Sequence, residues 1–240
     1  METILFLAII ALVAFLYASV GHGGASGYLA LMAIWGTPIG EVRSTALVLN
    51  IIVSSIAFIH YYRAGFFRWN LFWPFVVLSV PMAFVGAMIP LEGSVYKVVL
   101  GVILALAVFR LFFISEKKET KELKILPAIL FGGAIGMLSG MIGIGGGIIL
   151  SPLIILLGWS NIKESSAISA PFILVNSISG LVALLYFSLK WNTDMSLWVL
   201  FGILGGYAGA YFGSNYFNVP VVRNILATVL SIAAVKLMLV

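Results

Sequence analysis

The chain has 240 residues, of which 62% are hydrophobic and 9% are charged, and its mean hydropathy is +1.19. A soluble protein of this length needs far more polar surface to cover its core, so the composition excludes an ordinary soluble fold. The 13 Lys and Arg exceed the 8 Asp and Glu, but they lie in short loops, as in membrane proteins, and do not form a nucleic-acid-binding patch. Cysteine is absent, which excludes disulfides and thiolate metal sites.

Apolar segments long enough to cross a membrane recur along the chain. They are continuously apolar and do not alternate, which predicts helices and not a β-barrel. We expect them at 3–35, 44–62, 71–90, 95–114, 125–157, 166–187, 195–217 and 220–240. The first has no basic residues before it and no cleavage site after it, so we interpret it as a retained helix. The predicted fold class is an all-α polytopic membrane protein with about 8–10 membrane segments.

One markedly hydrophilic stretch, S-E-K-K-E-T-K-E-L-K at 115–124, interrupts this pattern. Its lysines predict that it faces the cytoplasm. We therefore divide the chain into a first transmembrane repeat at 1–114, a cytoplasmic basic linker at 115–124 and a second transmembrane repeat at 125–240.

The two parts match each other in sequence. When the chain is slid along itself so that Gly21 falls on Gly143, Gly23 and Gly24 fall on Gly145 and Gly146. In the same register Ser44 falls on Ser166 and Trp69-Asn70 on Trp191-Asn192. Glycine matches arise by chance in a chain with 25 Gly, but a Trp-Asn pair in the same register does not. We predict two homologous half-repeats.

Glycines break the segments 3–35 and 125–157, each of which is too long for one span. The breaks are G-H-G-G at 21–24 and G-I-G-G-G at 143–147, and interrupted segments at equivalent places in two halves predict a transporter binding site. If each segment crosses once, the repeats are parallel; if each turns back, they are inverted. We favour inversion, because the two breaks then approach one site from opposite faces. For the scattered Gly132, Gly136, Gly140, Gly202 and Gly206 we favour helix packing.

The breaks favour an anion. If Ala25 and Gly147 begin short half-helices, the N–H groups and partial positive charge of each helix start point at the break. Small hydroxyl and amide residues follow each break, although interhelical hydrogen bonding is their alternative role. The predicted substrate-binding residues are Gly23, Gly24, Ala25, Ser44, Thr45, Asn50, Gly145, Gly146, Gly147, Ser166, Ser169 and Asn176.

Few charged side chains fall within the apolar segments. Four acidic residues between or beside these segments are expected in loops: Glu41, Glu92, Glu164 and Asp194. Arg43 and Lys163 are expected just outside spans; we interpret them as loop charges, with attraction of anions towards the site as the alternative. His22 lies inside the first break and is a candidate proton-linked group, with a packing histidine as the alternative. The sequence has only two His and no H-E-x-x-H motif, so no catalytic constellation, metal site or cofactor is predicted and the chain is not expected to be an enzyme.

The motifs G-I-G-G-G-I-I-L-S-P at 143–152 and K-E-S-S-A-I-S at 163–169, together with the half-repeats, resemble the sulfite exporter TauE/SafE family. This family is also called the toluene sulfonate uptake permease family. The resemblance covers essentially the whole chain, although Ala30 stands where the second half has Pro152. It implies transport of a small sulfur-containing anion, sulfite or an organosulfonate, across the bacterial inner membrane.

The mechanism we expect is alternating access around a central site, and an anion channel of the same architecture is the alternative. The expected partners are a small anionic substrate and the lipid bilayer, without nucleic acid. The sequence leaves open which anion is carried, the direction of transport, the coupling ion and the oligomeric state, including a homodimer.

Overall fold

The computed structural model describes residues 2–37, 39–89, 120–187 and 194–218, with scattered residues between 220 and 231. The described residues form helices and no strands. The helices are α1 (Glu2–Ala18), α2 (Ala25–Ile34), α3 (Ile39–Arg63), α4 (Trp69–Ala87), α6 (Ile125–Ile142), α7 (Gly147–Leu156), α8 (Ile162–Phe187) and α9 (Met195–Asn215). The predicted segment 95–114, Glu92, the linker residues 115–119 and most of 220–240 lie outside the described residues.

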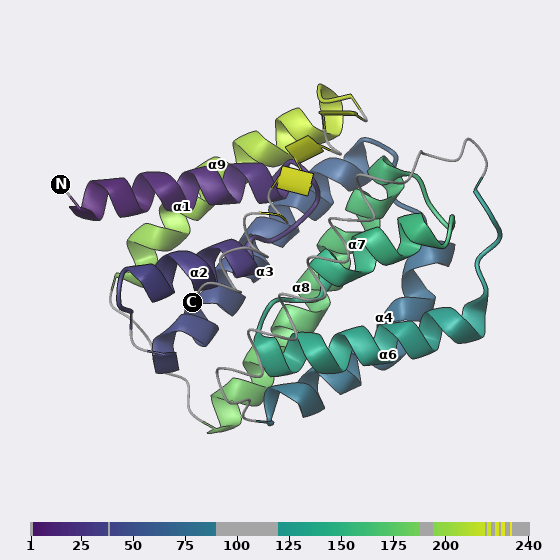
Figure 1. Ribbon diagram of the computed structural model, residues 1–240, viewed down its shortest axis with the longest axis horizontal. Helices are drawn as coiled ribbons and strands as arrows, with labels where there is room; N and C mark the ends of the chain where they lie inside the picture. Colours follow the sequence, from purple (N-terminus) through teal and green to yellow (C-terminus); the bar gives the residue numbers. More distant parts are fainter. Residues whose placement is uncertain are drawn as a thin grey trace.

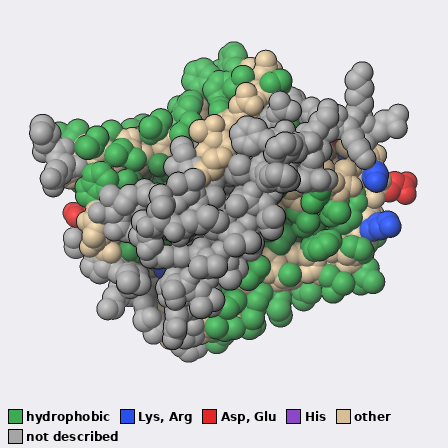
Figure 2. Space-filling view, viewed as in Figure 1, with side chains coloured by type: hydrophobic (Ala, Val, Ile, Leu, Met, Phe, Trp, Pro, Cys, Tyr) green, Lys and Arg blue, Asp and Glu red, His purple; other side chains and the backbone are tan. Residues whose placement is uncertain are grey.

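Of the described helices, 5 are long and apolar enough to cross a membrane: α3, α4, α6, α8 and α9. Large hydrophobic side chains point outward from them, including Leu126 (68% exposed) and Leu204 (58% exposed). Figure 2 shows hydrophobic side chains over much of the described surface in this view, while most of its charged side chains lie at one edge. The prediction of an all-α multi-pass membrane fold is confirmed.

The helices form two outer pairs with a central group between them. Helix α1 lies beside α9, and α4 lies beside α6 (Figure 1). Between the pairs α3 crosses α8, while α2 packs against α3 and α7 packs against α8. The two glycine breaks therefore lie in the interior of the bundle, next to the crossing helices.

Glycines let the helices of each outer pair approach closely. A Cβ added at Gly136 of α6 would overlap the carbonyl oxygen of Ser79 in α4, and one added at Gly209 of α9 would overlap the carbonyl oxygen of Phe15 in α1. The same contacts repeat one turn away on each side, in α6 at Gly132 and Gly140 and in α9 at Gly205 and Gly213. Their partners advance in the same direction, so both outer pairs are parallel. The packing interpretation of the α6 glycines is confirmed.

Segment 3–35 turns back on itself. The hydroxyls of Tyr17 in α1 and Ser26 in α2 are 2.7 Å apart, near the break. At the other end of the pair, the ring centroids of Phe6 in α1 and Trp35, the residue directly after α2, are 5.3 Å apart. Helix α2 therefore runs antiparallel to α1.

Segment 125–157 turns back in the same way. Helix α8 runs parallel to α4, because Arg68 lies beside Glu164 at one end and Ser179 donates to the carbonyl oxygen of Val80 near the other. Helix α7 runs antiparallel to α8. Ser151 lies against Ser169, whereas Gly147, earlier in α7, lies against Ile173, later in α8. Because α6 is parallel to α4, α7 runs antiparallel to α6.

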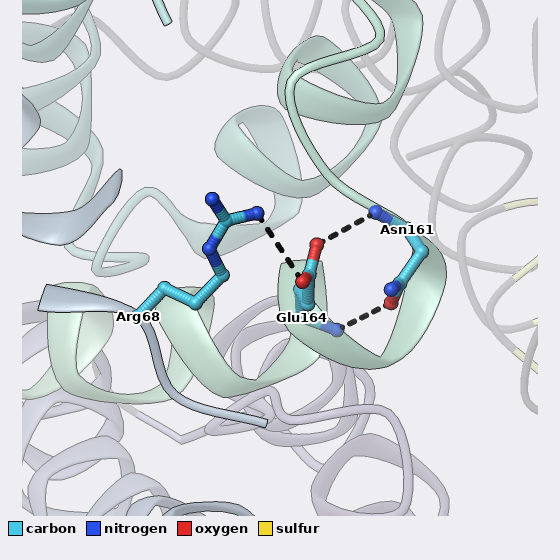
Figure 3. Close-up of polar contacts among 3 residues, drawn as sticks. All are labelled: Arg68, Asn161 and Glu164. Atoms are coloured by element: carbon cyan, nitrogen blue, oxygen red, sulfur yellow. Dashed lines mark hydrogen bonds and ion pairs between the residues drawn. The ribbon is translucent and has the colours of Figure 1, made fainter. Parts of the chain in front are cut away.

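Helix α8 begins with a reciprocal cap (Figure 3). The N–H of Glu164 donates to Asn161 Oδ1 at 2.8 Å, and the N–H of Asn161 donates to Glu164 Oε2 at 3.2 Å. This is a capping box, which satisfies two N–H groups that a helix start leaves unpaired. The prediction that Glu41 and Glu164 lie in loops is wrong: they lie in the first turns of α3 and α8. A carboxylate there is stabilised by the positive end of the helix dipole.

The prediction that Arg43 and Lys163 are loop charges is also wrong, because they lie inside α3 and α8. Lys163 is buried (7% exposed), and its Nζ donates to the carbonyl oxygens of Gly213 at 2.5 Å and Ser214 at 3.3 Å. These carbonyls belong to the last turn of α9. Arg43 donates in the same way to carbonyl oxygens at the ends of α4 and α6. Both cations thus bind helix C-termini, where the dipole favours positive charge.

Candidate substrate site at the glycine breaks

The first break separates α1, which ends at Ala18, from α2, which begins at Ala25. Its backbone depends on glycine: φ is +74° at Gly21 and +94° at Gly24, values that residues other than glycine rarely adopt. The carbonyl oxygen of Gly24 accepts the first hydrogen bond of α2. The helix start therefore faces the break directly, as the sequence predicts.

The second break has the same form. Helix α6 ends at Ile142, α7 begins at Gly147, and φ is +83° at Gly143, +74° at Gly145 and +78° at Gly146. No side chain among the described residues caps α7 with a hydrogen bond. Its first N–H groups are donors without an intrahelical partner. Both predicted half-helix starts are confirmed.

Asn50, from the middle of α3, contacts both breaks. It is fully buried, and its Oδ1 accepts a hydrogen bond from the N–H of Ala25 at 3.0 Å. Its Nδ2 donates to Ser177 Oγ of α8 at 3.2 Å. A Cβ added at Gly23 would overlap Asn50 Oδ1, and one added at Gly145 would lie 2.9 Å from Asn50 Nδ2. The carboxamide oxygen thus occupies a position at the start of α2 that an anion oxygen would also take.

His22 links the first break to α7 and α8. Its ring is buried, with Nδ1 2.9 Å from the carbonyl oxygen of Val20 and Nε2 3.2 Å from Ser151 Oγ. Ser151 Oγ is in turn 2.5 Å from Ser169 Oγ. Because a carbonyl only accepts, we assign the proton of the neutral ring to Nδ1, and Nε2 then accepts from Ser151. A chain of hydrogen bonds therefore runs from Ser169 through Ser151 to His22.

The other predicted site residues have varied surroundings. Ser44 Oγ donates to the carbonyl oxygen of Glu41 in its own helix at 3.1 Å. The backbone of Ser166 packs against Gly21, where a Cβ would overlap its carbonyl oxygen. Thr45 Oγ1 and both side-chain polar atoms of Asn176 are buried without a hydrogen-bond partner among the described residues. The structure thus brings Gly23, Ala25, Asn50 and Gly145 together, and Ser169 with His22 in an adjoining chain of hydrogen bonds.

Sequence reasoning missed three polar residues. Ser151 lies in the motif at 143–152 and Ser177 follows Asn176, so sequence position was the available signal for both. Tyr28 is one helical turn after Gly24, and its ring folds back over that glycine: a Cβ added at Gly24 would lie 2.9 Å from the Tyr28 hydroxyl. Its spacing of one turn from the break was the signal for this residue.

The sequence profile of the family described as sulfite exporter TauE/SafE matches residues 6–237. The chain is 32% identical over 235 residues to the probable membrane transporter protein y4hK of Sinorhizobium fredii, covering 94% of each protein. It is 40% identical over 70 residues, 29% of this chain and 26% of the other, to the probable membrane transporter protein MJ0441 of Methanocaldococcus jannaschii. The chain therefore belongs to the sulfite exporter TauE/SafE family, and it is a membrane transporter and not an enzyme.

Proposed function

We propose that this transporter carries a small sulfur-containing anion, sulfite or an organosulfonate, across the bacterial inner membrane by alternating access, with the anion held at the glycine breaks. The observation that carries the proposal is the position of Asn50, a buried carboxamide in contact with both breaks. Two helices begin beside it, and helix starts attract anions.

The donors around Asn50 suit an oxyanion. Asn50 Nδ2 lies next to Gly145, just before the start of α7, which no described side chain caps. An arriving anion would exchange with Asn50 Oδ1 at the N–H of Ala25 and accept from Asn50 Nδ2 and the first N–H groups of α7. Several donors around one anion, without a fixed counter-charge, allow binding that is specific yet weak enough for release.

We also propose that the two parts, 1–114 and 125–240, are inverted repeats joined by the basic linker 115–124. Matching contacts support this. A Cβ added at Gly86 of α4 would overlap the carbonyl oxygen of Met137 in α6. A Cβ added at Gly209 of α9 would likewise overlap the carbonyl oxygen of Phe15 in α1. In the register of the sequence self-match, Phe15 falls on Met137 and Gly86 falls one residue from Gly209.

Helix directions support inversion as well. Helix α3 runs antiparallel to α8, since Asn50 lies against Ser177 while Leu47 lies against Gly180, 3.7 Å from a Cβ placed there. These two helices occupy the same place in the two proposed repeats, and inversion requires equivalent helices to run in opposite directions.

Contacts between the two halves of the chain support alternating access. The hydrogen bonds from Asn50 to Ser177 and between His22 and Ser151 each join the first half to the second. A shift of one half against the other would therefore change both hydrogen bonds next to the proposed substrate site. A protonated His22 donates from both ring nitrogens, so the Ser151 hydroxyl hydrogen must point elsewhere and its oxygen must accept from Nε2. This gives a proton a route to alter the site, and we propose His22 as the proton-linked group.

The experiment is a melting-temperature panel on the purified protein with sulfite, thiosulfate, sulfoacetate, taurine, acetate and chloride. A ligand at 100 times its Kd stabilises the folded state by about 2.7 kcal/mol. Asn50→Asp places a tethered carboxylate at the N–H of Ala25 and should abolish the response to the sulfur anion. The exposed Asn215→Ala is the control and should respond like the parent.

Several outcomes decide the matter. A sulfur anion that stabilises the parent and the Asn215→Ala control, but not Asn50→Asp, supports the proposal. If no anion shifts the melt, the breaks are packing devices and the proposal fails. Proteoliposome flux then separates the carrier from the channel: counterflow and saturation indicate a carrier, and conductance far above carrier turnover indicates a channel.

A further inference from the structure

Tyr28 carries a buried hydroxyl at the start of α2. Tyr28 is 0% exposed, and its hydroxyl has no hydrogen-bond partner among the described residues. The ring folds back along its own helix, so that a Cβ added at Gly24 would lie 2.8 Å from Cζ and 2.9 Å from the hydroxyl oxygen. Gly24 is the residue immediately before α2, so the hydroxyl lies beside the start of the helix.

The two other buried tyrosines of the described chain are satisfied. The hydroxyl of Tyr17 is 2.7 Å from Ser26 Oγ, and that of Tyr61 donates to the carbonyl oxygen of Ser19 at 2.6 Å. Burying a hydroxyl without a partner costs free energy, and phenylalanine fills the same space without that cost. Tyr28 also lies beside Tyr17, but the two hydroxyls do not form a hydrogen bond with each other.

We propose that the Tyr28 hydroxyl donates a hydrogen bond to an oxygen of the transported anion and makes the first break selective for oxyanions over halides. This inference rests on the proposed function above. A sulfite or sulfonate group has three oxygens in different directions, so one oxygen can accept from the start of α2 while another accepts from Tyr28. A chloride ion is one centre and does not span both donors at ideal distance.

A difference between the two breaks explains why a further donor is needed at the first one. The start of α2 has a protein partner, Asn50 Oδ1 on the N–H of Ala25, whereas no described side chain caps α7. An anion that displaces Asn50 breaks the hydrogen bond between the N–H of Ala25 and Asn50 Oδ1. A second donor to the anion at the same helix start offsets this loss. Tyr28 provides that donor from within α2 itself.

The test compares two hydroxyl deletions, Tyr28→Phe and Tyr61→Phe, in purified protein titrated with sulfite, taurine and chloride. Tyr28→Phe should melt at or above the parent temperature without anion, because it removes an unpaired buried group. Its Kd for sulfite or taurine should rise about tenfold or more, since a hydrogen bond to a charged group is lost. Its weaker response to chloride should be unchanged. Tyr61→Phe should melt lower than the parent and keep its anion affinity.

The outcomes are distinct. If the parent binds no oxyanion of the panel, the proposed function fails and this inference fails with it. If the parent binds sulfite or taurine and Tyr28→Phe binds it equally well, only the role of Tyr28 is overturned. An equal loss of affinity for chloride and for the oxyanions would overturn the proposal that Tyr28 selects oxyanions over halides, although Tyr28 would still contact the anion.

Discussion

Asn50 Nδ2 donates to Ser177 Oγ at 3.2 Å, and this hydrogen bond joins α3 to α8 where the two helices cross. The same carboxamide accepts from the N–H of Ala25 and lies against glycines of both breaks. These neighbours come from three segments that are far apart in the sequence: the first break, the second break and α8. The position of Asn50 is therefore the place where a small change in the bundle reaches both breaks at once.

Gly23→Ala should displace Asn50 and remove the anion response. The new Cβ would overlap Asn50 Oδ1, so the carboxamide must move and the N–H of Ala25 loses its partner, at a cost of about 1–3 kcal/mol. The control is Gly36→Ala, where φ is +73° and a Cβ would meet nothing within 4 Å. That variant should lose stability through backbone strain and keep its response to anions. Melting curves with and without sulfite decide; an equal response of both variants would contradict the role of Asn50.

Gly136→Ala should destabilise the α4–α6 pair. Its Cβ would overlap the carbonyl oxygen of Ser79, which is backbone and does not move aside, so we expect a loss of about 1–3 kcal/mol. Gly180→Ala is the matched control within a helix, because the atom nearest its Cβ, in Leu47, is 3.7 Å away. Alanine there should be neutral or stabilise by up to about 1 kcal/mol. Unfolding in detergent measures both, and similar melting temperatures would show that close approach is unnecessary.

Lys163→Met should lower stability, because it removes the ammonium that caps α9. The carbonyl oxygens of Gly213 and Ser214 then lose their donor in a buried place, at a cost of about 1–3 kcal/mol. Lys121→Met, at an exposed position, is the control and should change stability by less than about 0.5 kcal/mol. Thermal unfolding of the two variants gives the comparison. Equal stability would mean that Lys163 is a solvated charge.

Glu164 should contribute through its cap and not through its ion pair. Arg68 is 49% exposed in the 3.3 Å pair with Glu164, and exposed ion pairs contribute only about 0–1 kcal/mol. Glu164→Gln keeps an acceptor for the N–H of Asn161 and should be nearly neutral, whereas Glu164→Ala should cost about 1 kcal/mol. Arg68→Gln should match Glu164→Gln in the same melts. A large loss in Glu164→Gln would instead assign the stability to charge.

The sequence predicted the parts of this fold that depend on local chemistry. Glycines at 21–24 and 143–147 interrupt apolar runs, and both breaks and both half-helix starts followed from that pattern. Lys163 was misplaced because its partners are carbonyls of α9, the first of them 50 residues away, and the polar start of α8 resembled a loop. The one-turn spacing of Tyr28 from Gly24 could have pointed to this residue, but its unpaired hydroxyl is a property of the packed structure and not of a sequence motif.

His22→Gln should uncouple transport from a proton gradient while leaving anion binding intact. Glutamine fills a similar space and offers a donor and an acceptor to the carbonyl oxygen of Val20 and to Ser151, but it does not titrate. In proteoliposomes loaded with sulfite, an imposed pH gradient should drive accumulation by the parent, and His22→Gln should catalyse only equilibration. Counterflow should persist in the variant, because the anion site around Asn50 is unchanged. Accumulation by His22→Gln at the parent's level would show that protons are coupled elsewhere or that the gradient acts without His22.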